Sequence, residues 1–360
     1  MKVAILASVW CQNLWDELIL KNEISLFEEG YSEEKIKFKV FSYDVNNPFF
    51  ERENVEYLEY FPINSKKLSN LWKNIKNLYL FIKTIFLTNV VVIWWWGLFY
   101  DNEIQSVWNP LKIWLFRARL AKLFRKKLVF YWVSINIKND VNLPFIKSIF
   151  SLWDEVYVRD EFSSDILRWL KIKCKVVLDS VFYDDKDNSN LIKKSFCLKK
   201  LECKKFKVSN LKNIDFSDKK VGISFRRGYL NHKYADKQNT KMKEKLEVWR
   251  LVEIINFVSL AWAKKITLLP HSFHKVDKLA NDYDFCINLK EELEKNWKRS
   301  LLKKIKICDD IKQTYKIYKN NKIDICLSQR LHSMILSQAY KIPFVWFSYS
   351  SKTDELLKKL

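Results

Sequence analysis

The hydrophobic and polar positions of this chain alternate between two patterns along nearly its whole length. Short apolar runs typical of buried strands are separated by stretches in which apolar residues recur roughly every three to four positions, as in helices. In the first half we predict strands over 2–8, 36–43, 90–93, 127–133, 155–158 and 176–178, and helices over 16–29, 68–86, 111–125, 146–153 and 161–170. This alternation predicts an α/β domain with a parallel sheet covered on both faces.

The second half repeats the alternation after a polar stretch. Residues 184–218 are rich in lysine and poor in clean periodicity, so we predict an interdomain linker with one small hairpin. Beyond it we predict strands over 221–225, 265–269, 284–289, 323–327 and 344–347, and helices over 242–261 and, in two pieces, 291–320. The chain is therefore expected to form two Rossmann-like, doubly wound domains, over 1–183 and 219–360.

Composition limits the classes of partner. The 360 residues carry a net charge of +22, which we attribute to AT-rich codon usage because no nucleic-acid-binding motif accompanies the charge. We therefore predict no nucleic-acid partner.

The seven cysteines are scattered without a Cys-x-x-Cys pair, which favours reduced thiols and argues against a zinc site or other metal centre. The chain start, 1–10, lacks the apolar core of a signal peptide, so we expect a cytoplasmic protein.

The stretch 324–352 carries most of the chemical information. A short apolar run ends at Ser328, a helical pattern begins near Arg330 and His332, and a second apolar run follows Pro343. Ligands of parallel α/β sheets bind at the carboxyl ends of strands, where this places both side chains. Arginine offers a planar fork for phosphate or carboxylate, and histidine can move a proton near neutral pH. We predict chemistry on an anionic substrate.

Three further polar residues follow predicted strands of the second domain. Arg226 and Arg227 come directly after 221–225, and His271 comes after 265–269. We therefore predict that Arg226 and Arg330 clamp an anion, with Arg227 as the reserve candidate for this clamp. We also expect His271 to line the same anion-binding site.

Four motifs, in order along nearly the whole chain, resemble those of the polysaccharide pyruvyl transferase family. NLWDELIL over 13–20 is similar to a family loop that reads Asn-Leu-Gly-Asp-Glu, and VVVIWWWGLFYD lies where the family has a glycine run after a strand. The central motif DEVYVRDEFSSDIL contains Arg159 and Asp160, and a strand with Asp179 follows. The C-terminal motif is matched by Arg330, His332, Ser333, Pro343, Ser348, Tyr349 and Lys352.

The resemblance implies pyruvyl transfer from phosphoenolpyruvate to a cell-surface glycan or its lipid-linked precursor, without a separate cofactor. It implies a GT-B-like arrangement of the two domains around a cleft, with the donor on the C-terminal side and the acceptor on the N-terminal side. The chain ends soon after 352, so a final helix crossing back to the first domain is expected to be missing or truncated. Two alternatives remain open: a GT-B glycosyltransferase that uses a nucleotide sugar, and a non-catalytic glycan- or membrane-binding protein.

Residue roles follow from the resemblance. We expect His332 to act as general acid or base, and Ser333 and Lys352 to bind substrate. Asn13, Asp16 and Glu17 precede or open the first predicted helix, where we expect Asn13 and Glu17 to bind substrate and Asp16 to act as base for the acceptor hydroxyl or as a sugar-binding group. Helix capping is the equally weighted alternative, since acidic residues favour the first turn of a helix.

Tryptophan repeatedly stands where the family has glycine. The chain has 15 Trp and only 4 Gly, whereas glycine is ordinarily about 7% of residues. We therefore predict that UGA encodes glycine in the source organism and that some tryptophans are glycine in the natural protein: Trp15, Trp94, Trp95, Trp96, Trp132 and Trp346. A true aromatic cluster is the alternative interpretation.

A basic segment could contact a membrane surface. Residues 111–127 include seven basic and no acidic residues, with Ile113, Phe116, Leu120 and Phe124 on one helical face. Such a helix can lie on an anionic membrane, which would place the enzyme peripherally at the inner face of the cell membrane. An ordinary sheet-packing helix is the slightly favoured alternative.

Overall fold

The computed structural model divides into two compact units, each built on its own parallel sheet. Unit 1 comprises 1–11 and 19–180, and unit 2 comprises 12–18 and 181–360. The structure describes residues 1–9, 12–42, 45, 48–60, 71–94, 99–100, 110–137, 139–177, 179–183, 196–202, 208–226, 237–273, 281–296 and 302–348. Within each unit the expected α/β class is correct.

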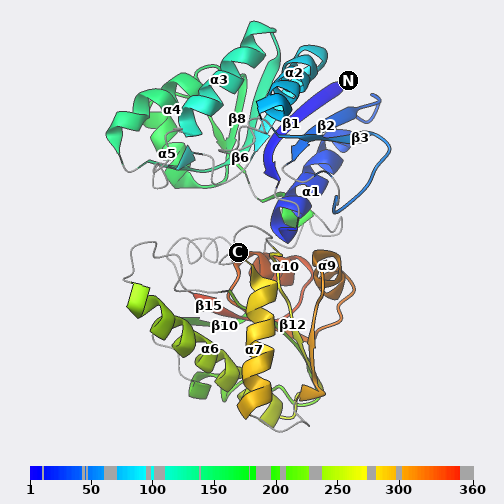
Figure 1. Cartoon of the computed structure of the whole chain (residues 1–360), viewed down its shortest axis with the longest axis vertical. Helices are drawn as coiled ribbons and strands as arrows, with labels where there is room; N and C mark the ends of the chain where they lie inside the picture. Colours follow the sequence, from blue (N-terminus) through cyan, green and yellow to red (C-terminus); the bar gives the residue numbers. More distant parts are fainter. Residues whose placement is uncertain are drawn as a thin grey trace. The chain divides into compact units, whose positions relative to one another are not determined.

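Seven parallel strands form the sheet of unit 1, in the order β3-β2-β1-β4-β6-β8-β9 (Figure 1). They are β1 (Lys2–Val9), β2 (Lys37–Ser42), β3 (Val55–Glu59), β4 (Val90–Trp94), β6 (Lys127–Val133), β8 (Glu155–Val158) and β9 (Lys175–Val176). Two short strands, β5 (Phe99–Tyr100) and β7 (Ile135–Asn136), pair separately. The helical segments within the unit are α2 (Leu71–Leu87), α3 (Pro110–Leu123), α4 (Leu143–Phe150), α5 (Glu161–Trp169) and η2 (Asp140–Asn142). The division between the units falls inside α1 (Leu14–Gly30) and η3 (Ser180–Tyr183).

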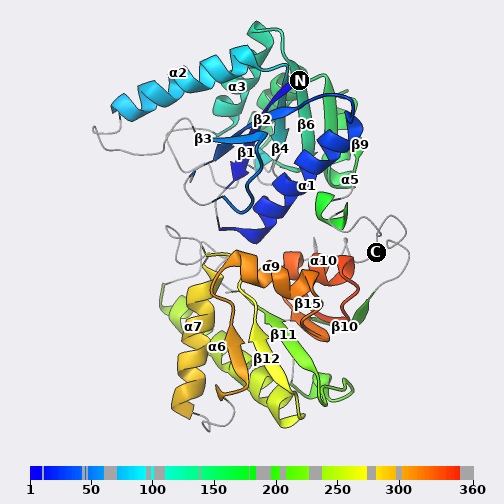
Figure 2. The same cartoon turned by 90° about the vertical axis from the view of Figure 1, so that its right-hand side faces the viewer.

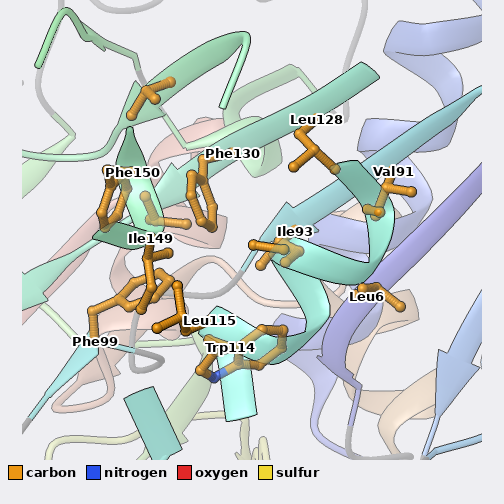
Figure 3. Close-up of a cluster of buried hydrophobic side chains, with 14 of the residues drawn as sticks. Leu6, Val91, Ile93, Phe99, Trp114, Leu115, Leu128, Phe130, Ile149 and Phe150 are labelled. Carbon is orange, nitrogen blue, oxygen red and sulfur yellow. The ribbon is translucent and has the colours of Figure 1, made fainter. Parts of the chain in front are cut away.

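Strand alternation sends neighbouring side chains of this sheet to opposite faces. One face packs against α2, α3 and α4 and forms the main apolar core of the unit. Figure 3 shows this cluster, in which Ile93 of β4 lies near Trp114 of α3, and the ring of Phe130 of β6 packs on that of Phe150 of α4. Because both faces of the sheet are covered, β4 is apolar at every position.

Six parallel strands form the sheet of unit 2, in the order β10-β15-β14-β11-β12-β13. They are β10 (Cys197–Glu202), β11 (Lys220–Ser224), β12 (Lys265–Leu268), β13 (Ile305–Ile307), β14 (Ile325–Ser328) and β15 (Phe344–Ser348). The helical segments are η6 (Val208–Leu211), α6 (Lys237–Leu260), α7 (Asp282–Asn296), α9 (Ile311–Lys319) and α10 (Leu331–Ala339). Helices α6 and α7 lie side by side and pack on one face of the sheet (Figure 1).

Two predicted elements of unit 2 are wrong. The strand expected over 284–289 is the first half of α7, since Phe285 and Leu289 lie four residues apart on one buried helical face. The helical stretch expected over 291–320 is interrupted by β13, whose three residues give too short an alternation to stand out from the flanking helical patterns.

The predicted linker over 184–218 also needs correction. Its described part contains β10, which pairs in parallel with β15 at the edge of the second sheet. Leu201 of β10 is buried in the core while Leu198 is exposed. This mixed, lysine-rich pattern is typical of an edge strand, which explains why periodicity alone gave no clear strand.

The apolar face predicted for the basic helix does not match the structure. In α3 the buried positions are Leu111, Trp114, Leu115, Ala118 and Ala121. Arg117 is only 4% exposed, and its guanidinium lies 4.4 Å from the Trp114 ring centre and 4.5 Å from that of Tyr60. The helix therefore packs on the unit, and only Phe116 and Leu123 leave large apolar side chains exposed on it. No helix in the described ranges is long and apolar enough to cross a membrane.

Candidate functional site

The order of strands in unit 2 changes direction between β11 and β14. From β11, the chain continues through β12 and β13 on one side, while β14 and β15 lie on the other. In open α/β sheets, ligands bind at the carboxyl ends of the strands at such a switch point. Arg226 follows β11 and Arg330 follows β14, so the fold brings these two predicted residues to neighbouring strand ends.

Gln329 holds the two strand ends together. Its backbone N–H donates to the Ser224 carbonyl at 2.9 Å, and its side-chain Oε1 accepts from the Arg226 N–H at 3.0 Å. These contacts fix the backbone before each arginine. Gln329 was not singled out from the sequence, because a glutamine after a strand carries no signal of its own.

Arg330 forms an ion pair with Asp282, a residue that sequence reasoning missed. Arg330 Nη2 contacts Asp282 Oδ1, and the other carboxylate oxygen accepts from the His271 backbone N–H at 3.1 Å. Arg330 Nε is buried and has no hydrogen-bond partner among the described residues. One end of the guanidinium is therefore anchored by Asp282, while its buried Nε–H is left without an acceptor among the described residues.

His271 lies beside this pair as a neutral imidazole. Burial first, and then the positive charge of Arg330, lower the pKa of His271 to about 3. Its Nε2 lies 3.1 Å from the Tyr318 hydroxyl, whereas the buried Nδ1 has no hydrogen-bond partner within the described ranges. At physiological pH this ring can donate or accept one further hydrogen bond, depending on its tautomer.

A buried hydroxyl network supports the imidazole. The Tyr318 hydroxyl lies 2.7 Å from Ser333 Oγ, which lies 2.9 Å from Ser328 Oγ. Ser333 is fully buried, an arrangement that fits support of the first turn of α10 better than direct substrate contact. Tyr318, on the buried face of α9, was not predicted because an aromatic residue on an amphipathic helix usually belongs to a core.

The segment 12–18 belongs to unit 2, although its place after β1 predicted a role on the N-terminal, acceptor side. The Leu14 N–H donates to the His271 carbonyl at 3.0 Å, and Asn13 forms an antiparallel bridge with Ser272. Through these contacts the Trp15 indole stacks on the His332 ring, with centroids 4.2 Å apart and planes at 9°. The proposed acid or base therefore has one ring face covered by tryptophan.

Asp16 and Glu17 are both buried in the first turn of α1. Asp16 Oδ2 accepts from Asn13 Nδ2 at 2.9 Å, and Asn13 Oδ1 accepts from the Trp15 N–H at 3.3 Å. This geometry fits the capping alternative for Asn13 and Asp16.

Other motif residues have structural partners or lie outside the described ranges. Arg227 and Lys352 are outside them. Arg159 pairs with Asp160 at 3.1 Å, and Asp160 caps α5 by accepting from the Ser163 N–H at 2.8 Å. Burial would raise the pKa of Asp160, but hydrogen bonds from Ser163 and the charge of Arg159 lower it overall. Among the described residues, no group of three or more His, Cys, Asp or Glu side chains could hold a metal ion.

Comparisons with known proteins give the family. A model of the family described as "Polysaccharide pyruvyl transferase" matches residues 16–351. A search of curated proteins found no match.

Solved structures show only weak similarity. The UDP-GlcNAc 2-epimerase of Methanocaldococcus jannaschii is 14% identical with a TM-score of 0.48, over 100% of this chain and 91% of that one. The UDP-GlcNAc 2-epimerase of Neisseria meningitidis is 10% identical with a TM-score of 0.46, over 99% of each chain. A heptosyltransferase of E. coli is 8% identical with a TM-score of 0.42, over 96% of this chain and 88% of that one. The assignment therefore rests on the family model, and by that match the chain belongs to the polysaccharide pyruvyl transferase family.

Proposed function

We propose that this protein transfers pyruvate from phosphoenolpyruvate to hydroxyls of a cell-surface glycan or its lipid-linked precursor, forming a ketal. The observation that carries the proposal is the position of Arg226 and Arg330 at the β11–β14 switch point, in a chain that the family model matches over 16–351. A donor with a phosphate and a carboxylate requires at least two cationic groups, and guanidinium forks suit both anions.

The reaction needs one proton donor and two deprotonations. Protonation of the donor's methylene carbon makes the adjacent carbon electron-poor, and a sugar hydroxyl attacks that carbon as it loses its own proton. Phosphate leaves with its bonding electrons, and a second hydroxyl closes the ketal with loss of another proton. No redox change occurs, and the donor is a substrate rather than a cofactor.

Residue roles in this proposal follow the site. Arg330 grips the donor anion through the guanidinium edge that Asp282 leaves open, and Arg226, with Arg227 next to it, completes the clamp. His332 transfers the proton, and neutral His271 orients the donor by a hydrogen bond from or to Nδ1. Asp16, held by the Asn13 side chain at the start of α1, serves the acceptor side, and Asn13 and Glu17 of the same segment bind there.

We further propose that the protein meets a membrane surface mainly through α2, with α3 of the segment 111–127 contributing only two apolar side chains. Large apolar side chains are exposed along α2, and α3, which lies beside it (Figure 2), adds Phe116 and Leu123. The exposed residues of α2 are Leu71, Trp72, Ile75, Tyr79, Phe86 and Leu87. Neither helix contains an acidic residue, and α2 carries Lys73, Lys76 and Lys83. Aromatic and lysine side chains on one surface favour an anionic bilayer.

Replacing Arg330 with lysine tests the proposed grip on the donor. Arg330→Lys keeps the positive charge beside Asp282 but removes the planar fork, so we expect the KM for phosphoenolpyruvate to rise by roughly ten- to a hundredfold, as for loss of one or two charged hydrogen bonds. Steady-state release of phosphate in the presence of a glycan acceptor measures it.

The matched control is Arg159→Lys, which changes an arginine already paired with Asp160 in unit 1. Its KM should stay at the wild-type value. An Arg330→Lys protein that folds as shown by its circular dichroism, yet has the same KM as this control, would remove Arg330 from the donor site.

A further inference from the structure

Unit 1 contains a cavity on the face of its sheet that α1 covers. Its volume is about 220 Å³, and it lies between α1 and the first residues of β4, β6 and β8. The lining residues are Glu23, Leu26, Phe27, Tyr31, Val90, Lys127, Val129, Tyr131, Glu155 and Tyr157. Because Val90, Lys127 and Glu155 begin their strands, the cavity opens at the amino ends of the strands, the edge opposite to that at which α/β substrates bind.

Glu23 is the unsatisfied group of this cavity. Its side chain is 2% exposed, and neither carboxyl oxygen has a hydrogen-bond partner among the described residues. Burial first, and then the charge of Asp179, raise the pKa of Glu23 well above its ordinary value. An acidic group without donors in an apolar environment is costly, so a ligand that donates to Glu23 would offset a cost that the unit itself leaves uncompensated.

The walls of the cavity are aromatic. Tyr131 and Tyr157 have ring centres 5.9 Å apart, and Phe27 and Tyr31 lie 6.3 Å apart with nearly parallel planes. Aromatic ring faces attract cations, most strongly when the cation is desolvated. None of these four residues is a tryptophan, so the walls do not depend on how UGA is translated.

The other charged groups of the cavity already have partners. Lys127 Nζ lies 2.6 Å from Glu155 Oε1, and the Tyr157 hydroxyl donates to Glu155 Oε2 at 2.7 Å. This rim cluster has its positive and negative charges matched. What the cavity lacks is a partner for the Glu23 carboxyl, and a cation bound there would favour its ionised form.

We propose that this cavity binds a small organic ammonium ion, with its N–H groups donating to Glu23 and its hydrocarbon part on the rings of Phe27, Tyr31, Tyr131 and Tyr157. The cavity is separate from the residues to which we assign pyruvyl transfer, which belong to unit 2. A metal ion fits less well, because one carboxyl and four rings offer too few oxygen ligands.

Isothermal titration of the full chain with a matched pair of probes tests the proposal. Cyclohexylammonium and cyclohexanol have nearly the same shape, but only the first carries a charge and three N–H donors. We expect cyclohexylammonium to bind at least about tenfold more tightly than cyclohexanol, because a single desolvated contact between a cation and a ring supplies about that factor in affinity.

Two variants assign the preference to Glu23. Glu23→Gln should reduce the preference for the ammonium probe to less than about threefold, while Glu56→Gln, in an exposed pair with Lys39 in the same unit, should leave it unchanged. Thermal melting should show Glu23→Gln to be folded, since the substitution removes a buried acid without changing its shape. Equal affinity for both probes, no saturable binding of either, or an undiminished preference in Glu23→Gln would overturn the proposal.

Discussion

Trp132 and Trp262 have backbone φ angles of 53° and 64°, in the left-handed region that favours glycine. Trp132 lies in β6 where the register with β8 shifts between Phe130 and Val133, and β-bulges of this kind often place glycine at such a position. Trp94, at the end of β4, is buried with its indole N–H unpartnered among the described residues. These local features support the prediction that some tryptophans are glycine in the natural protein.

Positive φ alone does not identify a recoded residue. Arg125, Lys171 and Lys341 also have positive φ, and each lies two residues beyond the end of a helix, α3, α5 and α10 respectively. Helices commonly end in this conformation, usually with glycine. The chain therefore tolerates ordinary side chains at helix ends, and Trp132, inside a strand, is the stronger indication.

Trp262→Gly should stabilise the protein. Trp262 is 79% exposed and follows the end of α6, where the Ala263 N–H donates to the Val258 carbonyl at 3.3 Å. Glycine removes the cost of a left-handed backbone while the lost indole buries little, so we expect the free energy of unfolding to rise by about 1 kcal/mol in urea melts.

The matched control is Trp169→Gly. Trp169 is also exposed but is the last residue of α5, so glycine there should lower the stability by up to about 1 kcal/mol.

Tryptic peptides of the natively translated protein should carry glycine at positions 132 and 94. Indole at those positions in native peptides would refute the recoding hypothesis.

The site residues show which kinds of signal a sequence carries. Arg226, His271 and Arg330 were recognisable because each lies within three residues of the end of an apolar strand, and the carboxyl ends of parallel strands meet at one edge of the sheet. Asp282 and Tyr318 were not, since one opens a helix that was mistaken for a strand and the other resembles a core residue. Partners supplied by distant helices depend on packing, which local periodicity does not encode.

At the scale of elements, strands and helices with strong apolar periodicity were predicted close to their observed bounds. The missed strands are β3 and β10, two polar edge strands, the three-residue strand β13 and the two-residue strands β5 and β7. The start of α7 was mistaken for a strand. The exposed row on α2 was also missed, because an apolar helix in an α/β chain is expected to be buried. Only the structure separates its inward positions, such as Phe81 and Ile85, from its outward ones.

Membrane contact through α2 is testable with vesicles containing anionic lipid. Replacing Tyr79 and Phe86 with serine removes two exposed rings, each of which contributes roughly 1–2 kcal/mol when it leaves water. We expect vesicle binding to fall by at least about tenfold, and binding of the unaltered protein to weaken with added salt.

Phe162→Ser on α5 provides the control, because Phe162 is equally exposed in the same unit but lies on another helix. It should bind vesicles as the unaltered protein does. Binding that is insensitive to the α2 changes, or that is lost equally in the Phe162 variant, would contradict a specific role for α2.

At the scale of the whole molecule, the chain consists of two doubly wound units, as the alternation of its apolar runs predicts. Each sheet has the strand order of a Rossmann-like fold, with its switch point between β1 and β4 in unit 1 and between β11 and β14 in unit 2. The assignment of 12–18 to unit 2 could not be predicted, since chain order places this segment beside β1. Its contacts with the loop after β12 bring Trp15 to His332.

The choice of donor is the central question for the molecule. Arg226, Arg330 and the neutral His271 follow the carboxyl ends of neighbouring strands in unit 2. We therefore expect the site to accept a small donor with two anionic groups. A glycosyltransferase of similar architecture would instead release a nucleotide from a nucleotide sugar.

The most direct measurement supplies the purified protein with a glycan acceptor and, separately, isotopically labelled phosphoenolpyruvate or labelled nucleotide sugars. We predict that phosphate is released from phosphoenolpyruvate only when acceptor is present, and that labelled pyruvate appears on the glycan as a ketal. Release of nucleotide with transfer of sugar, and no labelled pyruvate on the acceptor, would contradict the account.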